Sequence, residues 1–280
     1  MLALLKRNFL LYFRNRSGVF FSLLGALISF ILYIIFLQKN LTDAWAQLPN
    51  SGPVLNNWLM SGTLAVTGIT TSLAALTQLV KDREHQVDQD LYLSDQGKWR
   101  LPFSYLTSAI IISFFMQALM YVLMCGYFRE VPTLSLLPEV LLIMLLSSLL
   151  SSLVNAIFVY FFHSVDSLGK FSTIVGTASG FLVGTYVPLG VLPDFAQLLM
   201  KCTPATYIAS LYRQVLMKEA LNETFKSQDD LLREFQEKMG VQLKWQALLT
   251  KEQTYLIVLG GILLALGIWV SLAKRSNKRK

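Results

Sequence analysis

Apolar residues gather in six long runs along the chain, with polar and charged residues between them. A helix needs about 20 residues to cross the hydrocarbon core of a bilayer. The runs lie at 19–37, 55–80, 104–126, 138–162, 171–190 and 254–273. A single run, such as "MLLSSLLSSLVNAIFVYFF", could also be a buried core helix. Six of them in 280 residues leave no soluble layer to bury them, so the pattern predicts an all-α integral membrane protein with six transmembrane helices.

Composition agrees with this pattern. Hydrophobic residues make up 54% of the chain, charged residues 15%, and the mean hydropathy is +0.51. These values are too apolar for an ordinary soluble domain. We therefore treat the bilayer as the main solvent of this protein and expect it to be a multi-pass protein of the cell (plasma) membrane.

The first residues predict a short amphipathic helix, within 1–18, that precedes the first span. Apolar side chains between residues 2 and 13 recur at helical spacing, while Lys6, Arg7, Arg14 and Arg16 can reach toward lipid headgroups. The apolar face consists of Leu2, Leu5, Phe9, Tyr12 and Phe13. This is the pattern of a helix that lies in the membrane interface; a disordered basic tail is the alternative.

Lysine and arginine fall mainly on one side of the predicted membrane. They cluster in residues 6–16, 81–100 and 274–280, whereas the short loops of the opposite side hold only Lys39 and Arg129. Because cytoplasmic loops carry the excess of Lys and Arg, both termini are predicted to be cytoplasmic. The net charge of +7 thus reflects topology, and it does not indicate a nucleic-acid-binding surface, which needs a basic face on a soluble module.

Two cytoplasmic segments and one long external region connect the spans. Residues 81–103 carry charges of both signs, which favours a surface that docks another protein over a lipid-binding one, although a solvated loop is the alternative. Residues 163–170 are expected to form one tight turn. The external region, 188–253, contains an amphipathic pattern ending at Met239 that predicts a helix capped by Ser227, with Asp230 three residues on.

The interiors of the runs contain no Asp, Glu, Lys, Arg or His. Proton-coupled carriers and intramembrane proteases usually need such residues, so both classes lose support. Small and hydroxyl residues are present instead: Gly176, Gly180 and Gly184 repeat every four residues, and Thr67 and Thr71 lie in the second run. Such faces either pack helices inside one subunit or line a dimer interface or substrate path.

No sequence feature indicates a catalytic, metal or nucleotide-binding site in this chain. The two Gly-Lys pairs lack the upstream glycine and the following hydroxyl residue of a phosphate-binding loop. Metal-ligand clusters and a nucleophile spaced near a base are also missing from the sequence. We predict that the chain is not an enzyme and binds no cofactor itself; any nucleotide hydrolysis belongs to another subunit.

One stretch carries a resemblance to a known family. The segment "GTYVPLGVLPDFAQLLMKCTPATYIASLYRQVLM" resembles the hallmark of the type 2 ABC permeases (the ABC-2 type exporters of bacteria). In that hallmark, a glycine-bearing span leads to a proline near its outer end, and "LP" then opens a short apolar helix. A third proline and an aromatic residue come before a helix that ends in Arg. The matching residues are Gly184, Pro188, Leu192, Pro193, Pro204, Tyr207 and Arg213.

The resemblance implies a set of partners. Two permease copies, as a homodimer or heterodimer, pair with two separate ABC ATP-binding subunits, which hold ATP and Mg²⁺. The segment after the second span is where such permeases meet the ATPase, and the expected coupling residues here are Arg83, Glu84, Asp88 and Asp166. The chain departs from the family at His85, Gln86 and Val87, where many members have a glycine.

The expected activity is ATP-driven export of an amphipathic substrate. A path lined by apolar and hydroxyl groups suits drugs, antimicrobial peptides or lipid-linked molecules more than polysaccharides. Broken helices are tolerated in a membrane where they are buried or line a cavity. We therefore expect the proline-rich stretch to form re-entrant helices that cap the exit. The alternative function is a membrane sensor or immunity protein that binds an extracellular peptide without transport.

Overall fold

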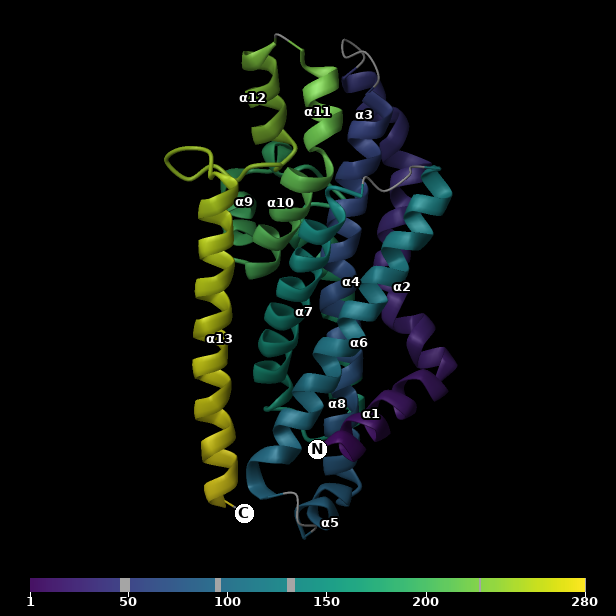
Figure 1. Cartoon of the computed structure of the whole chain (residues 1–280), viewed down its shortest axis with the longest axis vertical. Helices are drawn as coiled ribbons and strands as arrows, with labels where there is room; N and C mark the ends of the chain where they lie inside the picture. The colour runs from purple at the N-terminus through teal and green to yellow at the C-terminus, as the bar shows by residue number, and fades with distance from the viewer. Residues whose placement is uncertain (46–50, 94–96, 130–133, 227, 280) are drawn as a thin grey trace.

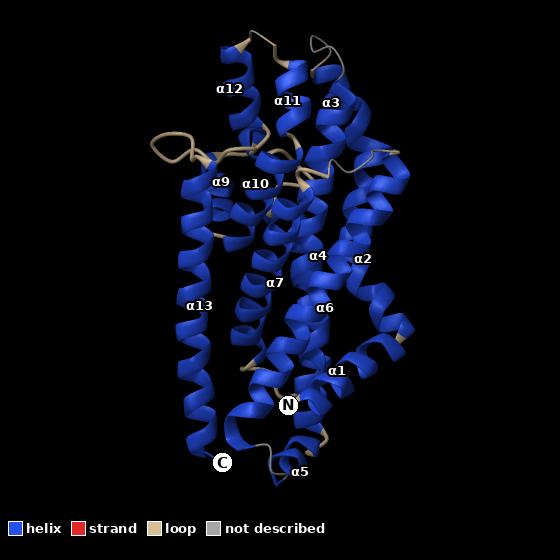
Figure 2. Cartoon of the chain, viewed as in Figure 1, coloured by secondary structure: helices blue, strands red, loops and turns tan. Residues whose placement is uncertain are grey.

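The computed structural model describes residues 1–45, 51–93, 97–129, 134–226 and 228–279. The long helices run along the long axis of the molecule, and the two termini lie toward the same end (Figure 1). In these ranges the helices are joined by turns and loops, and the only β pairing is an isolated bridge between Lys244 and Leu248 (Figure 2). The prediction of an all-α protein is confirmed.

Five helical segments in the described ranges are long and apolar enough to cross a membrane. They match five of the six apolar runs and extend over Arg16–Leu41, Gly52–Glu84, Trp99–Phe128, Leu137–Val159 and Lys251–Arg275. The first covers α2 (Arg16–Leu32), the π-helical turn η1 (Tyr33–Leu37) and the first part of α3 (Gln38–Ala44). The other four belong to α4 (Ser51–Glu84), α6 (Gly97–Phe128), α7 (Leu137–Val159) and α13 (Lys251–Arg279).

The fifth run forms a helix with different ends from those predicted over 171–190. Helix α8 (Val165–Leu182) begins where Ser164 caps it: the Ser164 hydroxyl accepts from the Ser167 N–H at 3.2 Å. The prediction that 163–170 forms only a tight turn is therefore wrong, because the non-helical residues between α7 and α8 end at Ser164. At about 1.5 Å per residue, the 18 residues of α8 reach close to the thickness of a hydrocarbon core.

The C-terminus of α8 explains why the run is not helical to residue 190. Gly184 has a φ of +72°, and its N–H donates to the Phe181 carbonyl at 2.9 Å. The next N–H, that of Thr185, donates to the Gly180 carbonyl at 2.8 Å. This pair of bonds around a left-handed glycine is the Schellman motif, which ends helices. The apolar residues beyond it, including Leu189 in η2 (Leu189–Val191), pack against protein.

The predicted amphipathic helix is present as α1 (Leu2–Arg14). Leu4 and Asn8 are its buried residues, while Lys6 and Arg14 are exposed. The side chain of Asn15 accepts from the Gly18 N–H at 3.1 Å and begins α2. Because of this cap, α1 turns away from the direction of α2 (Figure 1).

Four short helices lie in the half of the molecule opposite to the termini, where α3 also lies: α9 (Asp194–Lys201), α10 (Pro204–Leu216), α11 (Lys218–Thr224) and α12 (Asp229–Lys238) (Figure 1). Helix α12 is the helix predicted from the pattern ending at Met239. Its expected cap is wrong, because the N-cap is Gln228, without a side-chain cap bond. Ser227 itself lies outside the described residues.

Helix α4 is the central helix of the bundle. It packs against α2, α6, α7, α8 and α10. In its most apolar stretch of 18 residues, 78% is buried inside the protein. Trp58 and Leu64 on this helix are fully buried. The short helix α5 (Val87–Leu93) follows α4 at the end where the termini lie.

Candidate functional site: an apolar cavity and its two ends

An apolar cavity of about 430 Å³ lies between α7 and α8. Ile69 of α4 contributes to its wall, and residues 202–205, which comprise the α9–α10 turn and the first two residues of α10, contribute to one end. The described residues that line it include no charged side chain. Most are aliphatic or aromatic, and the polar ones are Ser151, Asn155, Ser179 and Thr203.

Some polar side chains of the cavity already form hydrogen bonds with other groups of the protein. The amide of Asn155 donates to the Ile69 carbonyl at 2.9 Å and to the Ser72 hydroxyl at 2.8 Å. The Ser179 hydroxyl donates to the Gly176 carbonyl at 3.0 Å. The cavity therefore offers a mostly apolar surface with a few hydroxyl groups, which fits an uncharged or apolar part of a ligand.

The first turn of α10, at this end of the cavity, is fixed to α8 and α9. The Thr206 hydroxyl lies 2.8 Å from the Leu182 carbonyl and 2.6 Å from the Met200 carbonyl. One residue later, the Tyr207 hydroxyl donates to the Lys201 carbonyl at 2.8 Å and accepts from the Trp245 indole at 3.1 Å. The start of α10 is thus held in one position relative to the end of α8.

The prolines of the sequence motif begin the short helices of this region. Pro188 precedes η2, Pro193 is the N-cap of α9, and Pro204 is the first residue of α10. Proline is tolerated at these positions because the N–H that it lacks has no partner inside the helix. The Leu192 carbonyl, between η2 and α9, accepts from the Gln197 side chain at 2.9 Å.

Arg213 of α10 is buried, with 1% of its surface exposed. Its guanidinium donates to the carbonyls of Val183 and Gly184 at 3.1 and 2.9 Å, and to the Gly240 carbonyl at 3.1 Å. The Cζ atom of Arg213 lies over the ring of Trp58, 5.1 Å from the ring centroid. Burial lowers the pKa of Arg213 to about 9, so the side chain remains charged near neutral pH. It joins α10 to the ends of α8 and α12.

The C-terminal end of α4 is joined to the start of α8. The Arg83 guanidinium donates to the carbonyls of Phe162 and Tyr160 at 2.8 and 3.3 Å. The Glu84 carboxylate accepts from the Val165 N–H at 2.9 Å. These bonds satisfy carbonyls after α7 and an N–H at the start of α8, groups that have no partner inside their own helices.

The other two predicted coupling residues lie in different environments. Asp88 of α5 is buried, with 5% of its surface exposed. The exposed Asp166 of α8 forms an ion pair with Lys170 at 2.6 Å. The structure therefore gathers Arg83, Glu84 and Asp166 around the α7–α8 connection.

The threonines and glycines predicted to line a helix face make different contacts in the structure. Thr67 and Thr71 are fully buried, and their hydroxyls donate to the α4 carbonyls of residues 63 and 67 at 2.8 and 2.6 Å. Gly180 makes room for the ring of Tyr186, while open space surrounds the position of a Cβ on Gly176. With Gly184 in the Schellman turn, the three glycines do not form one continuous helix-packing strip.

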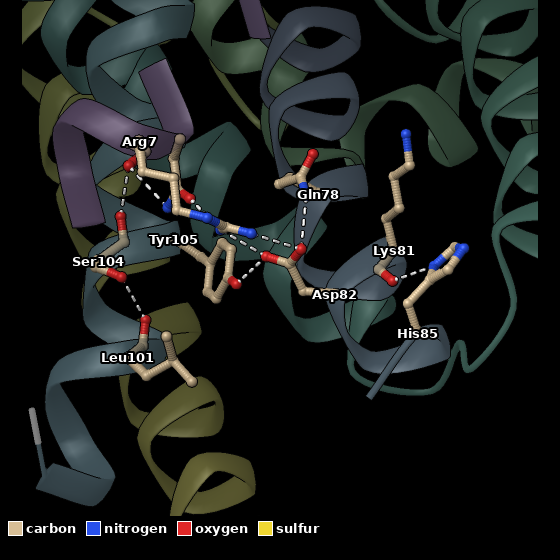
Figure 3. Close-up of polar contacts among 10 residues, drawn as sticks. Arg7, Gln78, Lys81, Asp82, His85, Leu101, Ser104 and Tyr105 are labelled. Atoms are coloured by element: carbon tan, nitrogen blue, oxygen red, sulfur yellow. Dashed lines mark hydrogen bonds and ion pairs between the residues drawn. The ribbon is translucent and has the colours of Figure 1, made fainter. Parts of the chain in front are cut away.

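A buried polar cluster where α1, α4 and α6 meet was not predicted from the sequence (Figure 3). Asp82 of α4 receives hydrogen bonds from Arg7 of α1 at 2.7 and 2.8 Å, and from Gln78 at 2.7 Å. The Tyr105 hydroxyl of α6 also donates to Asp82. The bond to the Asp82 carboxylate raises the pKa of Arg7 above its ordinary value. The only local signal for this cluster is the spacing of Gln78 and Asp82, one helical turn apart.

Within the described residues, no group of three or more His, Cys, Asp and Glu side chains could hold a metal ion. The family described as ABC-2 family transporter protein matches the chain over residues 37–269. That match covers most of the 280 residues, including the proline-rich region and the cavity. No curated protein matches the chain.

Proposed function

Because the chain belongs to the ABC-2 family of transporter proteins, we propose that it is the permease subunit of an ATP-driven exporter of amphipathic molecules. The chain is a multi-pass membrane protein and a transporter subunit without a catalytic domain. ABC-2 permeases work with ATP-binding subunits, so ATP and Mg²⁺ belong to the partner. Two permease copies and two ATPases form the proposed transporter.

The proposed topology has six spans, with α8 as the fifth and both termini in the cytoplasm. Two observations support it. The termini lie at the same end of the molecule as α5 (Figure 1), and that end carries most of the Lys and Arg clusters. In a Cys202→Ser background, cysteines placed at residue 3 and residue 226 should then react with a membrane-impermeant maleimide from opposite sides. Labelling of both from outside would refute this topology.

The cavity between α7 and α8 is the observation that carries the proposed export function. It combines an apolar wall, a few hydroxyl groups and an absence of charge among its described lining residues. A molecule with a hydrocarbon part can leave the bilayer core for such a surface without burying a charge against it. Drugs, antimicrobial peptides and lipid-linked molecules share that chemistry. We propose that this cavity forms one half of the path between two copies.

The contacts at the two ends of α8 suggest how the path opens. Arg83 and Glu84 join α8 to the cytoplasmic end of α4, and Thr206 and Arg213 join it to the external helices. A movement of the ATPase-facing segment can therefore reach the α9–α10 turn through one helix. ATP binding to the partner supplies the differential interaction that such a conformational change requires.

Purification of the tagged chain from its native membrane tests the proposal. An ABC ATP-binding subunit should co-purify, and the complex in proteoliposomes should accumulate a fluorescent amphiphile only when ATP and Mg²⁺ are present. A matched complex with an ATPase that binds but does not hydrolyse ATP is the control. Purification without any ATP-binding subunit would refute the exporter.

A second candidate is a membrane sensor or immunity protein, and one external feature favours it. A polar pocket of about 370 Å³ lies among α10, α11, α12 and the start of α13. Its lining includes Gln214, Asn222, Gln236 and Lys251, whose amide and ammonium groups could bind a peptide backbone or carboxylate. Peptide binding by a chain that purifies without an ATPase would support this function instead.

A further inference from the structure

The buried Asp82 cluster connects three helices that are far apart in the sequence. Asp82 is 3% exposed, and its carboxylate receives donors from α1, α4 and α6 (Figure 3). Arg7 binds both carboxylate oxygens. Two parallel N–H bonds to one carboxylate restrict the orientation of both groups more than a single contact does.

A second set of contacts fixes the same face of α1. Asn8, the neighbour of Arg7, is buried and donates to the Ser108 hydroxyl of α6 at 3.3 Å. Leu4, one turn earlier, belongs to a core cluster that includes Leu76 of α4 and Leu101 of α6. Helix α1 is therefore attached to the protein by one face and does not lie only against lipid.

The position of Asp82 makes this attachment relevant to coupling. The next two residues, Arg83 and Glu84, bind the α7–α8 connection. The last turn of α4 thus joins α1 and α6 through Asp82, and the start of α8 through Arg83 and Glu84. A buried carboxylate that loses its cationic partner is strongly unfavourable, so α1 cannot readily separate from this turn.

We propose that Arg7, Asp82 and Tyr105 are positioning residues for energy coupling: they make α1 move together with the ends of α4 and α6 when the ATPase acts. This inference rests on the proposed exporter. In this arrangement α1 carries the movement to α2, which follows it directly after Asn15. A helix held only by lipid could not transmit a displacement in this way.

The experiment uses the complete permease–ATPase complex in lipid nanodiscs and a readout that requires no known cargo. A spin label on the cysteine introduced by Phe195→Cys, in a Cys202→Ser background, reports the distance between the two copies at α9. Phe195 is exposed, at 70% of its surface. The distance is measured with and without ATP and vanadate, together with ATP hydrolysis.

In Arg7→Gln and Asp82→Asn, we expect the ATPase to remain bound and to hydrolyse ATP, while the ATP-driven distance change falls at least tenfold. Tyr105→Phe should reduce the change less, because Arg7 and Gln78 remain. The exposed Lys6→Gln, on the same helix, is the matched control and should behave as wild type. A full distance change in both charge variants would overturn the proposal.

A disulfide between two cysteines introduced by Asn8→Cys and Ser108→Cys supplies the opposite test. If α1 and α6 move together, locking them should leave the distance change intact, whereas its loss would mean that α1 must separate and would refute the proposal. If the charge variants fail to assemble, this disulfide variant still tests the proposal. Absence of any distance change in wild type would instead contradict the proposed exporter.

Discussion

Substitution of Gly180 by Ala, compared with the same change at Gly176, tests how α8 packs. Both residues lie in α8, one helical turn apart. A Cβ on Gly180 would stand 2.6 Å from Cε1 of Tyr186, with two other ring atoms closer still. A Cβ on Gly176 would meet no atom within 4 Å. The two substitutions add the same methyl group, so the difference between them isolates the contact with Tyr186.

The expected free energies of unfolding change in opposite directions. Replacing Gly by Ala in a helix stabilises it by about 0.5–1 kcal/mol, because the unfolded chain loses conformational freedom. Overpacking a well-packed site costs about 1–3 kcal/mol. Gly176→Ala should therefore stabilise the protein by up to about 1 kcal/mol. Gly180→Ala should destabilise it by about 1–2 kcal/mol, because Tyr186 must leave its place against Phe181.

Thermal unfolding of the purified protein in one detergent, followed by intrinsic fluorescence, measures the difference. We expect the Gly180→Ala midpoint to fall below wild type and the Gly176→Ala midpoint to equal or exceed it. The double variant Gly180→Ala/Tyr186→Ala should lose the clash and approach the midpoint of Tyr186→Ala alone. Equal midpoints for the two glycine variants would refute the assigned role of Gly180.

Three further predictions concern the two ends of α8 and the cavity. Arg213→Gln should lower the free energy of unfolding by about 3 kcal/mol, measured by chemical unfolding, because three buried carbonyls lose charge-assisted donors. Glu84→Gln should weaken the start of α8 by about 0.5–1 kcal/mol, seen as faster hydrogen exchange at Val165. Val154→Trp should block ATP-dependent export by filling the cavity, whereas Leu263→Trp on the exposed face of α13 should not; export by both would contradict the path.

Features that depend on local chemistry could be predicted from the sequence. Long apolar runs identified five candidate spans because a bilayer requires a minimum helical length. The spacing of apolar and basic residues predicted α1. The resemblance of the proline-rich stretch predicted short helices at Pro193 and Pro204, and α9 and α10 begin there; proline lacks an N–H and fits the first turn of a helix.

The ends of α8 could not be predicted from hydropathy. Leu189 and Tyr186 lie beyond the helix and are buried against protein, yet in a hydropathy profile they resemble residues that face lipid. Gly184 was interpreted as part of a packing strip, although it adopts the left-handed conformation that ends the helix. A glycine near the end of an apolar run is compatible with either role, and only the backbone conformation distinguishes them.

Contacts between segments far apart in the chain could also not be predicted from the sequence. Arg7 and Asp82 are 75 residues apart, and each is plausible alone as a solvated charge near a membrane surface. Their pairing requires α1 to lie across α4 and α6, which follows from the cap at Asn15 and the burial of Leu4 and Asn8. Neither residue signals its partner by local spacing.

The charges after the second span also show why docking residues are difficult to assign from sequence. Helix ends leave carbonyl and N–H groups without intrahelical partners, and in a packed bundle nearby charged side chains supply them. Arg83 and Glu84 do so for the α7–α8 connection. A prediction from charge alone counts such residues as surface for a partner. The Asp166–Lys170 pair, with both side chains 76% exposed, remains available for contact with an ATPase, and it lies on the helix that Glu84 positions.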